Sequence, residues 1–376
     1  MSKPSFTVGI EEEYLLVDPQ TRELATNVPD DLLTACESKV HELVKPEFLK
    51  SQIEVSTSVW PSIPKAIEEL ALLRRSVADV SNERGLAPIA ASTHPFSEWR
   101  EQEHTDAERY HMLHDAMQAV ARRLVICGMH VHVGIEDEDL RLDLMNQAVY
   151  FLPHLLALST SSPLWRGEDT GLKSYRLSIF DALPRTGLPE RFDSFGEYQR
   201  HVNVLTKAGV IKDATMLWWD IRPSHSFPTI EMRITDVCTS IMDAAAIAAL
   251  FQCVLHRLWR LRRDNQRWRT YADMLVQENR WRAQRYGLAE GLIDFGKGAI
   301  VSCADLGREL IEMLMDDAQE LGCAAELAHT ATIVKRGTSA DRQIAIYQAA
   351  IEKGADSREA AEAVVDFLVK ETVADT

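Results

Sequence analysis

The chain opens with a short apolar run that carries three consecutive glutamates. "VGIEEEYLLVD", residues 8–18, surrounds Glu11, Glu12 and Glu13 with valine, isoleucine, tyrosine and leucine. Such residues favour a pleated strand, in which side chains alternate between faces, so Glu11 and Glu13 share one face and Glu12 lies on the other. Two carboxylates about 7 Å apart repel by about 2 kcal/mol at an effective dielectric of about 20. The shared face therefore needs either water or a cation against it.

The same periodicity predicts alternating strands and helices through the first half of the chain. After a turn at 18–21 and a returning strand at 23–26, it predicts a helix at 29–38, two tightly joined strands over 41–60, a helix at 62–85, a strand at 86–92, an amphipathic helix at 106–124, a strand at 125–135 and a long helix at 136–162. Residues 163–193 are rich in Gly, Pro and Arg and are expected to form ordered loops.

Two further strands are predicted at 215–224 and 228–237, and the pattern from about residue 240 onward is almost entirely helical. We find no repeat, low-complexity tract or linker. The sequence thus predicts an α+β fold in one continuous domain, residues 1–376. Its sheet-rich part covers about 1–239 and its helical part about 240–376.

Composition narrows the class of protein. Hydrophobic residues make up 46% of the chain and charged residues 26%, as in ordinary soluble globular proteins. There is no uninterrupted apolar stretch near 20 residues and no signal-peptide pattern at the start, so no membrane association is expected. The six cysteines are scattered without a C-x-x-C pair, which is typical of reduced thiols in a cytoplasmic protein. The net charge of −16 argues against nucleic-acid binding.

One stretch runs against the acidic composition. Residues 257–285 contain no lysine and nine arginines: Arg257, Arg260, Arg262, Arg263, Arg267, Arg269, Arg280, Arg282 and Arg285. A solvated helix face would explain them. Arginine without lysine in an acidic chain also fits an anion site inside a cleft, because the guanidinium pairs with carboxylate and phosphate in two-pronged geometry.

Acidic and imidazole side chains interrupt four separate strand-like segments. They are Glu11 and Glu13, Glu47 and Glu54, His130 and His132, and Glu231, which precedes Arg233 by two residues. Several carboxylates converging on one sheet cannot all stay ionised without cations. Oxygen-rich ligation favours Mg²⁺ or Mn²⁺, and a hard cation beside arginines is typical of sites that handle ATP phosphates. Since neither a Walker A sequence nor G-x-G-x-x-G is present, ATP would bind on another scaffold.

Six blocks of the sequence together resemble the type 2 glutamate–cysteine ligase family of bacterial carboxylate–amine ligases, distantly related to glutamine synthetase. The blocks are "VGIEEEYLLVD", "EFLKSQIEVSTS", "ICGMHVHVGI", "SYRLSIFDALPRTGLP", "TIEMRITDV" and "ENRWRAQRYG". The resemblance implies a curved, mostly antiparallel sheet that forms a funnel-shaped active site, with helices outside. It implies ATP with Mg²⁺ or Mn²⁺, two or three ions, as cofactors.

The resemblance also assigns roles to individual residues. Glu11, Glu13, Glu47, Glu54, His130 and Glu231 match metal ligands. Arg233 matches a phosphate-facing, catalytic arginine, and Arg176 the arginine that holds the acid substrate's carboxylate, with Tyr175 beside it. His132 falls where relatives often carry Asn and is assigned to the substrate side. In the last block we expect Arg282, together with Asn279, to reach the nucleotide phosphates, while an ion-paired helix face is the structural alternative.

The implied activity is ATP-dependent ligation of a carboxylate, such as the γ-carboxylate of glutamate, to an amine through an acyl phosphate. Two other classes stay open at this stage. A Mn²⁺- or Zn²⁺-dependent hydrolase would use the acids and histidines but gives no role to the arginines. A catalytically idle nucleotide- or amino-acid-binding protein would not need so complete a ligand set. The expected partners are small-molecule acids and amines, and a homodimer is expected for the family. Trp218, Trp219 and Phe227 would favour an amine larger than cysteine unless they are core residues.

Overall fold

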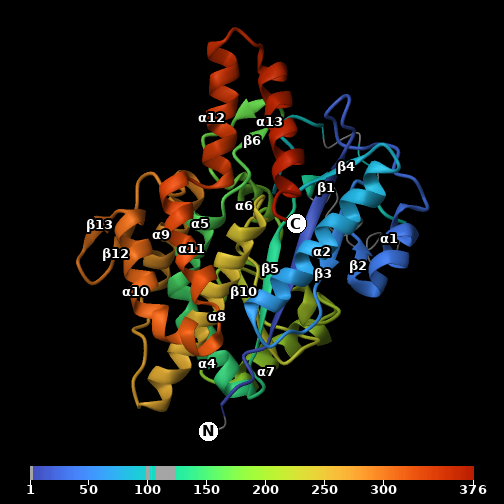
Figure 1. The fold of residues 1–376 in the computed structure, drawn as a ribbon. Helices are drawn as coiled ribbons and strands as arrows, with labels where there is room; N and C mark the ends of the chain where they lie inside the picture. The colour runs from blue at the N-terminus through green and yellow to red at the C-terminus, as the bar shows by residue number, and fades with distance from the viewer. Residues whose placement is uncertain (1–2, 99–101, 103, 107–122) are drawn as a thin grey trace.

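The computed structural model describes residues 3–98, 102, 104–106 and 123–376 (Figure 1). The helix predicted at 106–124 lies almost entirely outside these residues. The first elements are β1 (Val8–Val17), α1 (Leu32–Val40), η1 (His41–Leu43), β2 (Val44–Pro46), β3 (Gln52–Ser56), α2 (Ile63–Asn82), β4 (Ala87–Ile89) and β5 (Met129–Gly134).

The middle of the chain supplies α4 (Glu138–Ala148), η4 (Val149–Phe151), α5 (Leu152–Ser159), β6 (Leu164–Trp165), β7 (Glu168–Asp169), α6 (Tyr175–Phe180), β8 (Thr186–Gly187), α7 (Phe195–Lys207), η5 (Ala214–Met216), β9 (Trp218–Trp219), β10 (Ile221–Pro223) and β11 (Thr229–Met232). The remainder forms α8 (Ile241–Arg263), α9 (Asp273–Tyr286), β12 (Leu292–Asp294), β13 (Ala299–Val301), α10 (Cys303–Leu321), α11 (Ala324–Arg336), α12 (Ser339–Glu352) and α13 (Ser357–Thr372).

The main sheet has seven strands in the order β10-β11-β5-β1-β3-β2, with β4 paired to the other end of β1. Every pairing in this sheet is antiparallel. The first strand therefore lies at the centre, where its apolar residues are fully buried, and strands from distant parts of the chain flank it. The predicted α+β fold, with an antiparallel sheet followed by a helical C-terminal part, is confirmed.

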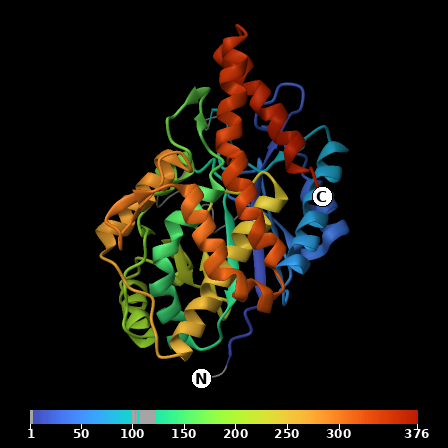
Figure 2. The same ribbon diagram turned by 60° about the vertical axis from the view of Figure 1, so that its left-hand side comes forward.

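Helix α8 is the main contact between the helical part and the sheet. It packs against α2, α4, α5, α11 and β5, and Figures 1 and 2 show it crossing the middle of the molecule. By length and composition alone α8 could cross a membrane, but 89% of its apolar window is buried inside this fold. We interpret it as a core helix.

Some local predictions were wrong. The segment at 23–26 makes only an isolated bridge between Val17 and Leu24. The long helix predicted at 136–162 is divided by η4, and α5 restarts with Pro153 in its first turn, where proline's missing N–H costs least. Helix α7 was not predicted, the region 163–193 contains the short helix α6, and the β12–β13 hairpin interrupts the helical part.

The reverse face of β1 holds its third glutamate. Arg74 of α2 pairs with Glu12 through Nη2–Oε1 at 2.7 Å and Nε–Oε2 at 2.8 Å, and both side chains are fully buried. Tyr14 adds a hydrogen bond to Glu12 at 2.6 Å. Arg74 also donates to the Cys238 carbonyl at 2.7 Å. As predicted from strand alternation, the Glu12 side chain lies on the other face of β1 from Glu11 and Glu13. Its ion pair with Arg74 holds α2 against that face.

Candidate functional site

One face of the sheet carries a polar stripe that runs across six strands. Antiparallel register places Glu13 opposite Glu54, Glu11 opposite His130, and His132 opposite Glu231. The stripe ends in Arg222 of β10, opposite Glu231, and in Lys45 of β2, opposite Glu54. Residues that lie up to about 220 positions apart in sequence are thus neighbours because the strands pair in this order.

Glu13, Glu47 and Glu54 form the first carboxylate cluster, which we call cluster 1. Their carboxylate oxygens lie within 4.8 Å of one another. Burial raises the pKa of Glu13 to about 7, and the nearby Glu54 charge adds to this shift. Burial likewise raises the pKa of Glu54 to about 8, with the Glu11 and Glu47 charges adding to it. The predicted meeting of Glu47 and Glu54 across the β2–β3 turn is therefore present, and the three carboxylates repel one another.

Glu11, His132 and Glu231 form the second group, cluster 2, again with ligand atoms within 4.8 Å of one another. Burial works against ionisation of Glu11, but hydrogen bonds from His130 and His132 hold its pKa well below the usual value. His130 Nδ1 lies 3.1 Å from Glu11 Oε2. His130 does not belong to either three-residue group among the described residues. Of the two histidines, His132 is the one grouped with two carboxylates.

Two arginines hold Glu231. Arg222 binds it through Nε–Oε2 at 2.8 Å and Nη2–Oε1 at 3.0 Å, and Arg233 Nη1 binds Oε1 as well. Burial opposes the charge of Glu231, yet these guanidiniums keep its pKa well below the ordinary value. Arg233 Nη1 also lies 3.5 Å from His130 Nδ1, and burial together with Arg233 lowers the pKa of His130 to about 4. Sequence reasoning missed Arg222; its place between the buried Ile221 and Pro223 separates it from the apolar face, but only the β10–β11 pairing puts it opposite Glu231.

Arg176 approaches the same face from α6. Its guanidinium donates to the carbonyls of Arg233 and Ile234, both at 3.2 Å, and is buried. Gly128 explains how it fits: a Cβ at that position would lie 2.4 Å from Arg176 Nη2. The Gly128 N–H donates to Glu13 Oε2 at 2.7 Å. The glycine before β5 therefore lets the arginine come close to cluster 1. Tyr175, also on α6, stacks on Trp165 with ring centroids 5.5 Å apart.

The two residues predicted to reach a nucleotide, Asn279 and Arg282, both contact the backbone near β12. The Asn279 amide donates to the Ile293 carbonyl at 2.9 Å and accepts from its N–H at 2.7 Å. Arg282 donates to the carbonyls of Glu290, at 2.8 Å, and Gly291, at 3.1 Å. In this arrangement both side chains anchor the start of the β12–β13 hairpin.

The buried arginine of α9 is instead Arg280, which sequence reasoning did not single out. It binds Asp220 through Nε at 2.6 Å and Asp181 through Nη1 at 2.7 Å. The backbone carbonyl of Asp220 accepts from Arg233 N at 2.8 Å. Arg280 therefore ties α9 to the strands that carry Arg222 and Arg233. Only its burial distinguishes it from its neighbours, and that property depends on tertiary packing.

The aromatic residues near this region divide into two kinds. Trp219 packs with Phe192 and Tyr198 at centroid distances of 6.1 and 6.3 Å, as a core residue would. Trp218 is half-buried under Arg185, whose guanidinium lies 5.3 Å from its ring. Phe227 is 56% exposed and meets His132 edge-on at 6.2 Å. Of the three, Phe227 is the one that adjoins cluster 2 with an accessible ring.

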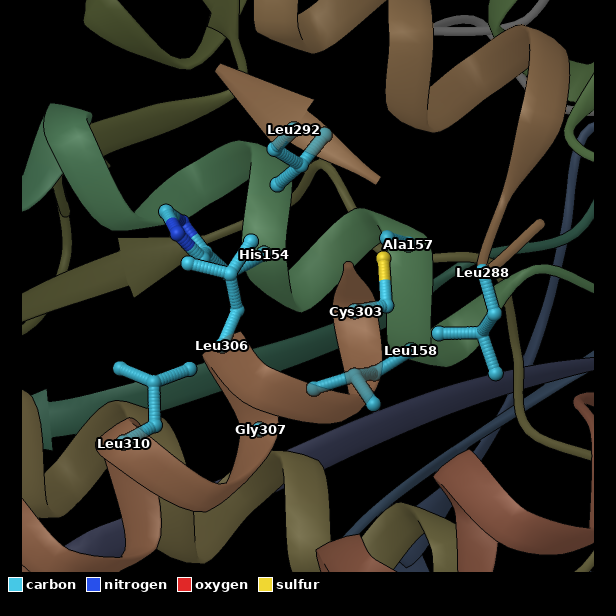
Figure 3. Close-up of a pocket in the computed structure, with 9 residues that line it drawn as sticks. All are labelled: His154, Ala157, Leu158, Leu288, Leu292, Cys303, Leu306, Gly307 and Leu310. Atoms are coloured by element: carbon cyan, nitrogen blue, oxygen red, sulfur yellow. The ribbon is translucent and has the colours of Figure 1, made fainter. Parts of the chain in front are cut away.

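A small apolar cavity lies elsewhere, between α5, α10 and β12 (Figure 3). Its volume is about 10 Å³, room for about one water molecule, and His154 is its only ring-bearing lining residue. It shares no residue with clusters 1 and 2. The candidate substrate region is therefore the polar stripe.

The donor sets of clusters 1 and 2 fit hard divalent cations. Five carboxylates and one imidazole supply mostly oxygen ligands, which Mg²⁺ and Mn²⁺ prefer. Burial and carboxylate repulsion raise the pKa of Glu13 and Glu54 even though Arg176 and Arg233 act against the shift at Glu13 and Lys45 acts against it at Glu54, so a bound cation would stabilise their ionised forms. Cluster 2 is flanked by Arg222 and Arg233, so an anion beside it would find two guanidiniums.

Comparison with known proteins identifies the family of this chain. Residues 7–367 match the model of glutamate-cysteine ligase family 2. A relative from Rhodospirillum rubrum with the provisional name glutamate–cysteine ligase 2 is 60% identical, covering 100% of this chain and 97% of the relative. A relative of the same name from Jannaschia sp. (strain CCS1) is 51% identical, covering 98% and 97%.

Solved structures show the fold. A glutamate–cysteine ligase from Francisella tularensis, solved in complex with AMP, aligns with a TM-score of 0.67 at 14% identity, covering 98% of this chain and 89% of that one. A bifunctional glutathione synthetase from Pasteurella multocida gives the same TM-score and identity, covering 97% and 52%. By the match along nearly its whole length, the chain belongs to glutamate-cysteine ligase family 2.

Proposed function

We propose that this protein joins a small carboxylic acid to an amine with ATP as the energy source, releasing ADP and phosphate. The observation that carries this proposal is the pairing of two carboxylate clusters with Arg176, Arg222 and Arg233 on one face of the sheet. Family membership supports an ADP-forming carbon–nitrogen ligase. Family membership does not favour the two alternatives that the sequence left open, a metallohydrolase and a catalytically idle binding protein.

Such a reaction must bring an anionic carboxylate up to the γ-phosphate of ATP. Charge at the transferring phosphoryl group has to be neutralised, which divalent cations and arginines do best in a site shielded from water. Bound Mg²⁺ or Mn²⁺ would supply this neutralisation. Glu13, Glu47 and Glu54 would hold one ion, and Glu11, His132 and Glu231 another, with room for a third left open.

The protein's own arginines would orient the two substrates. Arg233, beside Glu231, faces the region where phosphate oxygens would lie and stabilises negative charge there. Arg176 would bind the acid substrate's carboxylate, with Tyr175 at its side, so that the attacking oxygen is positioned in line. The acyl phosphate formed on the acid is then open to attack by the amine, and phosphate leaves as the amide bond forms.

The two histidines have different prospective roles. The family resemblance assigned His130 to the metal and His132 to the substrate. The grouping of His132 with Glu11 and Glu231 supports the reverse for His132, while His130, lying between Glu11 and Arg233, is placed to contact phosphate or metal-bound groups. Both Asn279 and Arg282 bind backbone carbonyls near β12, which supports an anchoring role. Their contact with the nucleotide stays a prediction.

Glutamate and cysteine are the first substrates to test, because the family description names them. An exposed Phe227 next to His132 supports acceptance of an amine with an apolar side chain. We also propose a cytoplasmic homodimer that binds neither nucleic acid nor membranes. The continuous packing of α8 against β5, α2 and α4 supports treating residues 1–376 as one domain.

The decisive experiment measures ADP release from ATP and Mg²⁺ with acids and amines offered singly and in pairs. ADP formed only when both are present establishes the ligase and identifies both substrates. Release with water alone as acceptor would support a hydrolase instead. An Arg176→Lys variant should raise the KM for the acid while leaving the KM for ATP unchanged.

A further inference from the structure

A second cavity lies outside the sheet, along the last turns of α8, whose gold end is at the bottom of Figure 1. It has a volume of about 510 Å³, within the range of small-molecule sites. Its walls are the last turns of α8 and the segment that leads from α8 to α9. Three arginines, Arg257, Arg267 and Arg269, and two aromatic rings, Trp268 and Tyr271, supply most of its lining. No residue of the polar stripe takes part.

The arginines of this cavity have no carboxylate among the residues that line it. Arg267 pairs with Asp143 at 3.1 Å. Within the described part of the chain, however, neither Arg257 nor Arg269 forms an ion pair, and Arg257 Nε is sealed from solvent without a hydrogen-bond partner. No carboxylate lines the cavity, although the chain carries a net charge of −16. Two unpaired guanidiniums in one concave site call for an anionic ligand.

The aromatic rings are held in place behind this charge. Trp268 packs on Phe151 and Tyr150 with centroids 5.0 and 5.6 Å apart, and its backbone N–H donates to Gln147 at 2.8 Å. Tyr271 packs on Phe295 at 4.8 Å and lies under Arg269 at 5.1 Å. Because Arg269 already covers Tyr271, Trp268 is the lining ring on which a planar group can stack, as bases do on Trp and Tyr.

We propose that this cavity binds a free nucleoside phosphate, with the phosphate on Arg257 and Arg269 and the base against Trp268. The net charge of −16 repels the many phosphates of a nucleic acid, whereas a mononucleotide places its phosphates only on the local arginines. A mononucleotide is therefore the ligand class. Binding here adds a second nucleotide per chain, separate from the one consumed in the proposed reaction.

Calorimetry with ADP, in the presence of excess EDTA, tests the proposal on the full chain without relying on turnover. ADP should bind the wild-type protein, and Arg257→Leu and Arg269→Leu should each weaken binding about tenfold or more, since each removes a charged contact. Arg263→Leu is the matched control: it removes an arginine six residues along α8 that pairs with Asp264 and does not line the cavity, and it should leave binding unchanged.

Two further comparisons complete the test. Inorganic phosphate should bind at least about tenfold more weakly than ADP, and Trp268→Leu should remove that difference, because the leucine offers no ring on which the base can stack. Equal affinities for phosphate and ADP in the wild-type protein would overturn the nucleoside part of the proposal. ADP binding that survives Arg257→Leu and Arg269→Leu but disappears in Arg233→Leu would place the nucleotide at the polar stripe and reject this cavity. If Arg257→Leu fails to fold, the exposed Arg269 still provides the test.

Discussion

Arg222 holds Glu231 from the neighbouring strand by two parallel hydrogen bonds, at 2.8 and 3.0 Å. The same arginine donates to the carbonyls of Thr215 and Leu217, at 2.8 and 2.9 Å, which fixes its own position. A carboxylate held in this way cannot rotate freely, so one of its faces is presented to Glu11 and His132. The pair therefore sets the shape of cluster 2 before any ligand arrives.

Replacing Arg222 should damage the site more than the fold. Arg222→Gln leaves Glu231 with Arg233 alone, and we expect kcat/KM for ADP release to fall about 100-fold, the usual effect of losing one positioned charge in such a site. Arg222→Lys should recover only part of this loss, because lysine cannot make the paired contact. A cycle with Glu231→Gln should show a coupling of about 1–3 kcal/mol in unfolding free energy. Strictly additive effects would contradict a direct link.

Cluster 1 should make the metal-free protein less stable as pH rises. Glu13 and Glu54 have pKa values raised by burial to about 7 and about 8, whereas in the unfolded chain they ionise near 4.5. The unfolded state therefore loses these protons first, and stability falls between about pH 4.5 and 8. Thermal unfolding in EDTA should show this decline, and millimolar Mg²⁺ should remove it by pairing the carboxylates. In Glu54→Gln both the decline and the Mg²⁺ response should shrink; an unchanged Mg²⁺ response would exclude cluster 1 as a cation site.

Gly128 should be intolerant of any side chain. A methyl group there would lie 2.4 Å from Arg176 Nη2, so Gly128→Ala must push the guanidinium away from the sheet. We expect the KM for the acid substrate to rise at least about tenfold and the melting temperature to fall, since the buried guanidinium must move as a whole and lose its hydrogen bonds to the Arg233 and Ile234 carbonyls. Gly196→Ala is the control, because its Cβ would meet nothing closer than 3.9 Å. A normal KM in Gly128→Ala would argue against Arg176 as the acid-binding residue.

Asn279→Ala separates an anchoring role from nucleotide binding. Loss of both hydrogen bonds to Ile293 should cost about 1–3 kcal/mol of stability, because the backbone groups of β12 lose their partner. The KM for ATP should stay within about twofold of wild type. A large rise in this KM with an unchanged melting temperature would restore the nucleotide role expected from the sequence, and Arg282→Ala can be read by the same two measurements.

The sequence was most informative where local pattern and chemistry coincide. Glutamates inside the apolar run of β1 predicted a polar face on a central strand, and alternation correctly separated Glu12 from Glu11 and Glu13. The adjacency of Glu47 and Glu54 also followed from a short turn between two strands. These inferences need only the period of a strand and the cost of an uncompensated charge.

The sequence did not reveal which distant residues pair across the sheet. Arg222 matters because β10 pairs with β11 so that it lies opposite Glu231, and residues nine apart in sequence give no sign of which pairing will form. Arg280 looks like its exposed neighbours until α9 packs onto Asp220. The β12–β13 hairpin was missed because each strand spans three residues, too few to show a period.

The reverse side of β1 bears on how the protein is made. Arg74, which neutralises Glu12, also contacts the carbonyls of Thr239 and Thr372, and the Thr372 hydroxyl accepts from Ala90 N at the end of β4. These contacts join residues 282 and 298 positions apart. The buried surroundings of β1 are therefore incomplete until a segment 298 positions beyond Arg74 is present. Until then this apolar, charge-bearing strand is open to aggregation, which makes docking of the end of α13, rather than pairing of the strands, the step that completes the fold.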